Sequence, residues 1–106
     1  MYKINIDGAF KSATSKGGWG FLVRDSVGVF LEGGCGNLCG VATSFQAEAL
    51  AALHSLERAA LLGMTRIILE TDATELVRGL TSEDLDYSVD GVLLKQIRDL
   101  IEAYFV

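Results

Sequence analysis

The 106-residue sequence contains no proline, one histidine and two cysteines, and it lacks any long apolar run. No stretch approaches the roughly 18–20 apolar residues of a membrane-spanning helix. A zinc site of about four nitrogen and sulfur ligands would lack its donors. The absence of proline fits a chain without linkers at its ends. Together with an apolar content of 50%, the length predicts one domain with one core.

Basic residues are also scarce. Nine Lys and Arg stand against 14 Asp and Glu, which gives a formal net charge of −5. A domain that binds nucleic acid mainly through its charge is usually basic, so this balance argues against strong autonomous binding of that kind. It does not argue against a metal site, because clustered carboxylates are what such a site needs.

No charged and then apolar leader precedes the first predicted strand, which begins at residue 2. We therefore expect an intracellular protein, in the nucleus or the cytoplasm. In those compartments Cys35 and Cys39 should remain reduced thiols. From the abrupt start we expect either a trimmed chain or a piece of a longer one.

The first strand carries an acidic residue at an unusual place. Apolar and polar residues alternate from Tyr2 to Asp7, which predicts a strand over Met1–Phe10. A carboxylate in the middle of a strand is costly unless it is exposed, paired or holding a cation. Taken alone, Asp7 fits an exposed edge strand as well as it fits a site.

Two more strands are predicted at Gly17–Asp25 and Val29–Gly33. The connections between these strands are short, which favours an antiparallel three-strand meander. The glycine-rich stretch Gly33–Val41, which contains both cysteines, is predicted to be a loop.

At Thr43 the apolar period changes from that of a strand to that of a helix. Thr43 and Gln46 fit a capping box, in which each side chain satisfies a free backbone amide of the other residue. The apolar spacing from Ala49 to Ala60 predicts an amphipathic helix that ends near Gly63.

The rest of the chain predicts a strand and two helices. The strand lies within Thr65–Asp72 and is apolar on both faces, which is typical of a central strand, and the helix before it favours a parallel pairing with the first strand. A short helix at Ala73–Leu80, an acidic loop at Thr81–Asp90 and a last helix over Val92–Tyr104 follow. The order βββ-α-β-α-α is that of an α/β domain with a mixed sheet. The core is predicted to include Ile4, Ile6, Trp19, Phe21, Leu53, Leu56, Ile67 and Leu69.

Three acidic residues stand out by position: Asp7 in the first strand, Glu48 in the second helical turn, and Asp72 at the end of the later strand. Sites in open α/β sheets form beyond the carboxyl ends of parallel strands, where a helix start can also reach. Three carboxylates brought together there would repel one another unless a divalent cation lay among them. Ligation by oxygen alone suits Mg²⁺ or Mn²⁺.

Four segments carry a resemblance to a known family: IDGAF at Ile6–Phe10, GGWGFLVRD at Gly17–Asp25, AEAL at Ala47–Leu50 and ETDA at Glu70–Ala73. Together, in this order, they resemble the ribonuclease H domain in its reverse-transcriptase-like branch, which is common in plant genomes and non-LTR retroelements. The resemblance covers nearly the whole chain, residues 1–106, as a single domain. It implies a five-stranded mixed sheet with helices packed on it. It also implies two-metal cleavage of the RNA strand of an RNA–DNA hybrid.

The resemblance further implies the roles of individual residues. Asp7, Glu48 and Asp72 would be three of the family's four metal-binding catalytic acids, holding Mg²⁺ or Mn²⁺, with two ions when substrate is bound. Gly8 would let the backbone approach the hybrid, where a contact to a 2′-hydroxyl would distinguish RNA from DNA. The residues assigned to substrate binding are Gly8, Ala9, Thr43 and Ser44.

The chain departs from the family pattern in three places. Phe45 stands where relatives carry an amide, and the loop that is basic in some relatives reads Glu83, Asp84 and Asp86. The family's fourth acid follows the last helix, and this chain stops at Val106. We therefore expect a domain truncated at the C-terminus, with its last strand or helix missing and weak or no cleavage, and a parent chain that carries a polymerase.

Two alternatives remain at this stage. A domesticated or decayed ribonuclease H-like module would bind nucleic acid or protein without cutting. A phosphate-binding ATPase of the actin and sugar-kinase kind shares the sheet topology, but it needs two such domains and this chain supplies one.

Overall fold

The computed structural model describes residues 1–11, 16–39, 43–81 and 89–105 of the chain. Three strands come first, then a helix, a fourth strand and two helices, in the predicted order βββ-α-β-α-α. The elements are β1 (Tyr2–Lys11), β2 (Lys16–Arg24), β3 (Phe30–Cys39), α1 (Ser44–Leu61), β4 (Ile67–Glu70), α2 (Thr74–Thr81) and α3 (Val89–Tyr104). None of these helices is long and apolar enough to cross a membrane.

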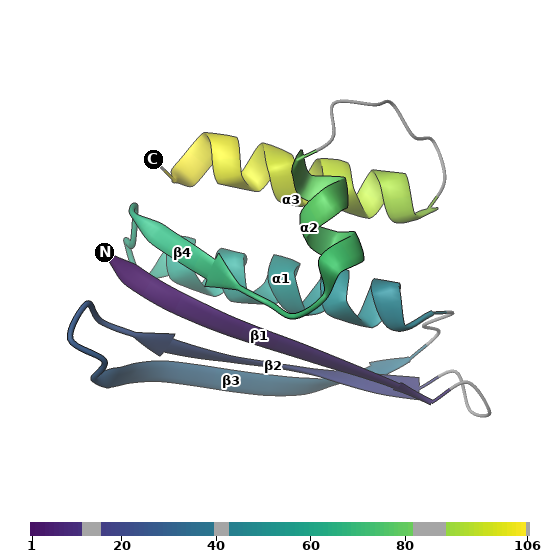
Figure 1. Ribbon diagram of the computed structural model, residues 1–106, viewed down its shortest axis with the longest axis horizontal. Helices are drawn as coiled ribbons and strands as arrows, with labels where there is room; N and C mark the ends of the chain where they lie inside the picture. The colour runs from purple at the N-terminus through teal and green to yellow at the C-terminus, as the bar shows by residue number, and fades with distance from the viewer. Residues whose placement is uncertain (12–15, 40–42, 82–88, 106) are drawn as a thin grey trace.

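The four described strands form one mixed sheet in the order β3-β2-β1-β4. The strands β1, β2 and β3 make the predicted antiparallel meander, and β4 runs parallel to β1. All three helices lie on the same side of this sheet, with α1 between the sheet and α3 (Figure 1). The α/β class and the mixed sheet are thus as predicted.

The helix α1 begins and ends where its capping residues require. The Thr43 hydroxyl accepts a hydrogen bond from the Gln46 backbone N–H at 3.1 Å, which is the first of the two bonds of the predicted capping box. The Gln46 side chain donates to Asp90 Oδ1 at 3.1 Å, which joins the starts of α1 and α3. After the helix, Gly63 adopts a φ of 77°, a left-handed conformation that favours glycine.

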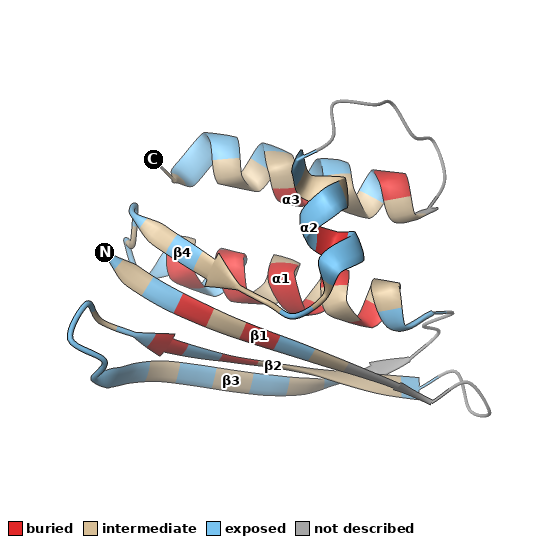
Figure 2. Cartoon of the chain, viewed as in Figure 1, coloured by how far each residue is buried: buried red, intermediate tan, exposed pale blue. Residues whose placement is uncertain are grey.

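The core lies between the sheet and α1 (Figure 2). All eight residues predicted for it belong to one cluster: Ile4, Ile6, Phe21 and Leu56 are buried, and Trp19, Leu53, Ile67 and Leu69 are partly buried against them. The helix contributes mainly alanines to this contact, among them Ala49, Ala52 and Ala59, all fully buried. Such small side chains allow the helix backbone to lie close to the sheet.

The predicted loop at Gly33–Val41 is wrong over its described part, because β3 continues to Cys39. Glycine usually indicates a turn or a break, but here it makes room for aromatic rings from β2. A Cβ at Gly34 would lie 2.7 Å from Cε1 of Phe21, and one at Gly36 would lie 2.5 Å from Nε1 of Trp19. The glycines are therefore required by packing within a strand.

The strand β4 also differs from its prediction. It was expected to be a central strand covered on both faces, yet it lies at one end of the described sheet. Ile68 is 41% exposed, while its neighbours Ile67 and Leu69 pack on the core. The described helices cover only one face of the sheet, so the side chain that points to the other face stays in contact with solvent.

Candidate active site

Asp7 lies where β1 continues past the end of β4. The last residue pair between the two parallel strands is Asn5 with Glu70, and Asp7 follows two residues later. Its side chain is exposed, although β1 is an inner strand with neighbours on both sides, so the edge-strand interpretation is wrong. Opposite Asp7 on β2 is Gly20, which has no side chain to cover the carboxylate.

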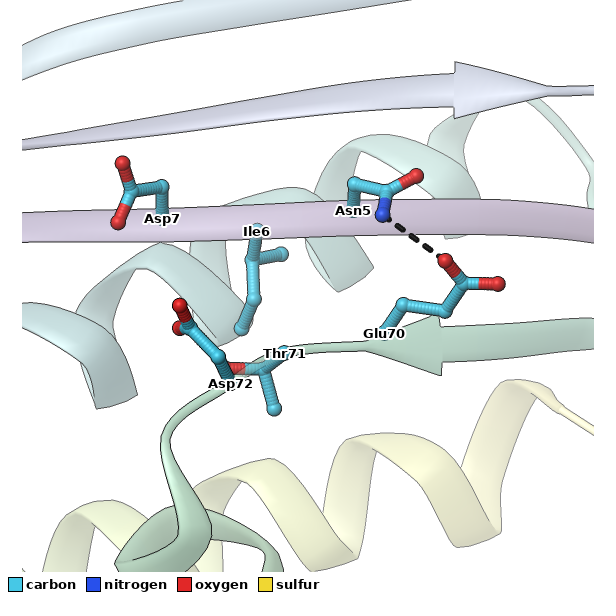
Figure 3. A pocket seen from close by; sticks show the side chains of 6 residues that line it. All are labelled: Asn5, Ile6, Asp7, Glu70, Thr71 and Asp72. Atoms are coloured by element: carbon cyan, nitrogen blue, oxygen red, sulfur yellow. Dashed lines mark hydrogen bonds between the residues drawn. The ribbon is translucent and has the colours of Figure 1, made fainter.

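Asp72 reaches the same place from β4. It follows the strand by two residues, in a turn where the Thr71 hydroxyl accepts a hydrogen bond from the Ala73 N–H at 3.0 Å. Asp7 and Asp72 line one cavity of about 460 Å³, together with Asn5, Ile6, Glu70 and Thr71. In Figure 3 the two aspartates lie at one end of this group, and Asn5 and Glu70 lie at the other.

Glu48 lies on α1, and its side chain is hydrogen-bonded to the backbone of β1. The backbone N–H of Gly8 donates to Glu48 Oε1 at 3.1 Å. At this point the strand and the helix are too close for any side chain: a Cβ at Gly8 would lie 2.7 Å from the Ala47 carbonyl carbon and 2.8 Å from the Glu48 nitrogen. The second oxygen of the carboxylate, Glu48 Oε2, is buried and has no hydrogen-bond partner.

The electrostatics of Glu48 reflect this position. Burial raises the pKa of its carboxyl above the ordinary value of 4.5, and the hydrogen bond from Gly8 partly opposes the rise. The charges of Asp7 and Asp72 raise this pKa further. Asp7 and Asp72 are therefore close enough to Glu48 for their charges to act on its carboxyl.

A second cavity, of about 360 Å³, adjoins the first at Asp72. Its lining comes from the first two turns of α1, the first turn of α2 and the two residues before α2: Ser44, Phe45, Glu48, Asp72, Ala73, Thr74 and Glu75. Asp72 lines both cavities. Ser44 thus lines the same cavity as Glu48 and Asp72, and its role in substrate binding stays a prediction.

The other residues predicted to bind substrate are placed less directly. The hydroxyl of Thr43 is engaged in capping α1. Ala9 lies in β1 next to Gly8 and pairs with Gly18, and the structure describes only its backbone. Sequence reasoning did not select Asn5 or Glu70, although a polar residue two positions before each acid was a visible signal.

Within the described ranges, no three His, Cys, Asp or Glu side chains are gathered closely enough to form a complete metal site. The arrangement nonetheless fits a hard divalent cation. Glu48 Oε2 is a buried oxygen without a donor, and the nearby aspartates add negative charge. Mg²⁺ usually keeps several waters and takes only one or two carboxylates, so an incomplete protein cage suits it.

Comparisons with known proteins agree with this fold. Residues 5–105 match the family model described as reverse transcriptase-like. The structure is similar to ribonuclease H1 from the halophilic archaeon Halobacterium salinarum, with a TM-score of 0.86 and 24% identity over 99% of this chain and 83% of that one. Among curated protein sequences, none matches significantly.

Two further solved structures are similar. The N-terminal ribonuclease H domain of a Mycobacterium tuberculosis protein has a TM-score of 0.81 and 22% identity, over 100% of this chain and 83% of that one. A ribonuclease H1 isolated from compost, solved in complex with an RNA/DNA hybrid, has a TM-score of 0.85 and 18% identity, over 100% and 83% of the two chains. At these identities the similarity concerns the fold.

Proposed function

The chain belongs to the reverse transcriptase-like family and has a ribonuclease H-like fold, and from this premise we propose that it is a metal-dependent endonuclease. Its substrate would be the RNA strand of an RNA–DNA hybrid. The observation that carries the proposal is a pair of cavities that share Asp72, the first also lined by Asp7 and the second by Glu48, whose Oε2 is buried without a hydrogen-bond partner.

Asp7, Glu48 and Asp72 would hold the metal, which we propose to be Mg²⁺ or Mn²⁺, with two ions in the substrate complex. When bound, these ions lower the pKa of the attacking water and stabilise the leaving oxygen. The oxygen ligands of the three residues suit these ions better than zinc. The ions would also neutralise the repulsion from Asp7 and Asp72, which adds to the effect of burial on the pKa of Glu48.

The protein's own part is to position these carboxylates. The Gly8 N–H holds one oxygen of Glu48, so that the other oxygen has a defined place. Asp7 is exposed and can face a scissile phosphate directly. Ser44, at the first turn of α1, lines the adjoining cavity and offers a hydroxyl to the hybrid backbone.

The proposal is tested with a labelled RNA–DNA hybrid, incubated with Mg²⁺ or Mn²⁺ and with EDTA. We expect weak metal-dependent cleavage of the RNA strand alone, and loss of that cleavage in Asp72→Asn. Asp99→Asn is the matched control, because Asp99 is an exposed acid on α3, paired with Lys95, and the charge change is the same. Equal cleavage by wild type and Asp72→Asn would refute the proposal.

A second candidate function is hybrid binding without cleavage. The incomplete metal cage in the described residues favours it, and the net charge of −5 would keep such binding weak. It predicts binding of the hybrid by the wild type with no cleavage at any concentration of Mg²⁺ or Mn²⁺. A binding measurement in EDTA beside the cleavage assay separates the two functions.

A further inference from the structure

A hydrogen bond between side chains closes the pairing of β1 and β4. Asn5 and Glu70 are directly opposite in the register, as the last pair of the two parallel strands. The Asn5 Nδ2 donates to Glu70 Oε2 at 2.9 Å (Figure 3). The two residues are 65 positions apart in the sequence, so the bond joins two distant segments.

This bond stands immediately before the site. Asn5 precedes Asp7 by two residues, and Glu70 precedes Asp72 by two residues. All four side chains line the same cavity. Beyond the Asn5–Glu70 pair no further residue pair joins the strands in the register. The separation of the two aspartates therefore depends on how firmly this last pair is held.

Stability alone gives little reason for these two residue types. Asn5 Oδ1 is buried without a hydrogen-bond partner, which is unfavourable. Glu70 is half-buried, and no basic side chain pairs with it in the described part of the chain. Two apolar side chains could occupy such positions without these costs. The presence of a polar pair at this place points to a role in the adjacent site.

We propose that Asn5 and Glu70 are positioning residues, whose hydrogen bond sets the spacing of Asp7 and Asp72 for metal binding. The inference rests on the proposed function, because it assumes that the two aspartates hold a divalent ion. Partners that orient metal ligands from outside the coordination sphere are a general feature of metal sites. Here the orientation acts through the backbones of two parallel strands.

The test uses three proteins of equal net charge: the wild type, Asn5→Val, and the exchange variant Asn5→Asp/Glu70→Gln. Asn5→Val removes the bond, while the exchange variant restores it with donor and acceptor reversed. Asn37→Val, on the exposed side of β3, is the control for the same substitution elsewhere in the sheet. Mn²⁺ affinity is measured by calorimetry, and thermal unfolding in EDTA reports folding separately.

We expect Asn5→Val to bind Mn²⁺ about 10-fold more weakly than the wild type, the lower end of the effect of such partners. The exchange variant and Asn37→Val should bind as the wild type does. Folded Asn5→Val with wild-type affinity would overturn the inference, and so would an exchange variant as weak as Asn5→Val. If Asn5→Val does not fold, the exchange variant decides: wild-type affinity supports the inference and weak binding overturns it. A wild type that binds no Mn²⁺ refutes the proposed function instead, and the inference falls with it.

Discussion

Replacing Gly8 by alanine is the most direct test of how the strand and the helix meet at the site. The added methyl would lie 2.7–2.8 Å from three backbone atoms of Ala47 and Glu48. Backbone atoms of a helix cannot rotate away as a side chain can. The variant must therefore move α1 away from β1, which also stretches the hydrogen bond from the Gly8 N–H to Glu48.

The size of the effect follows from three contributions. Overpacking costs about 1–3 kcal/mol, and losing a hydrogen bond to a charged group costs about 1.5–3 kcal/mol. Removing a glycine from a strand regains about 0.5–1 kcal/mol. Because the Glu48 bond is partly buried and only weakened, we expect a net loss of about 2–4 kcal/mol in the free energy of unfolding.

The measurement is urea unfolding in EDTA, with Gly20→Ala as the matched control. A Cβ at Gly20 would meet only the Gly34 carbonyl oxygen, at an ordinary 3.7 Å. This second variant should be as stable as the wild type or more stable, because it removes a strand glycine without a clash. A loss below about 0.5 kcal/mol in Gly8→Ala, the range of an inconsequential surface change, would refute the close contact.

Three further predictions concern charge, packing and thiols. The raised pKa of Glu48 means that its contribution to stability is fully present below pH 4.5 and is lost as the pH rises through the folded-state value. Glu48→Gln should abolish that loss in metal-free protein. If the Tm of the wild type and that of Glu48→Gln change with pH in the same way, the prediction is wrong. Leu56→Ala, at a fully buried position, should cost about 2–5 kcal/mol in urea unfolding, and Leu53→Ala should cost less because Leu53 is only partly buried. Thiol titration of the unfolded, unreduced protein should find both Cys35 and Cys39 free, since residues four apart on a strand are about 13 Å apart and a disulfide needs less than about 7 Å.

Patterns among neighbouring residues were sufficient to predict much of the fold. The alternation around Ile4 and Ile6 and the cap at Thr43 depend on neighbouring residues, and both are found as predicted. The sequence predicts a third strand that ends too early, at Gly33, because the side chains that require its later glycines lie on another strand. In the sequence Gly34 and Gly36 indicate a loop, and only their packing against the aromatic rings of β2 shows why they belong to a strand.

The residues of the candidate site could be selected from the sequence only in part. Asp7, Glu48 and Asp72 could be selected because an acid within or beside an apolar pattern is visible in the sequence. Asn5 and Glu70 could not be paired, since their contact depends on the exact register of two strands that are far apart in the chain. The link between Gly8 and Glu48 likewise depends on the packing of α1 across β1.

The fit between β2 and β3 restricts how the sequence can vary. The ring of Trp19 occupies the space above Gly36 and stacks on His54 at a centroid distance of 4.8 Å, and the ring of Phe21 occupies the space above Gly34. A side chain added at Gly34 or Gly36 must therefore be matched by a smaller one at the opposite position of β2. The positions of each pair should covary in volume across the family, with a large residue on one strand accompanied by glycine on the other.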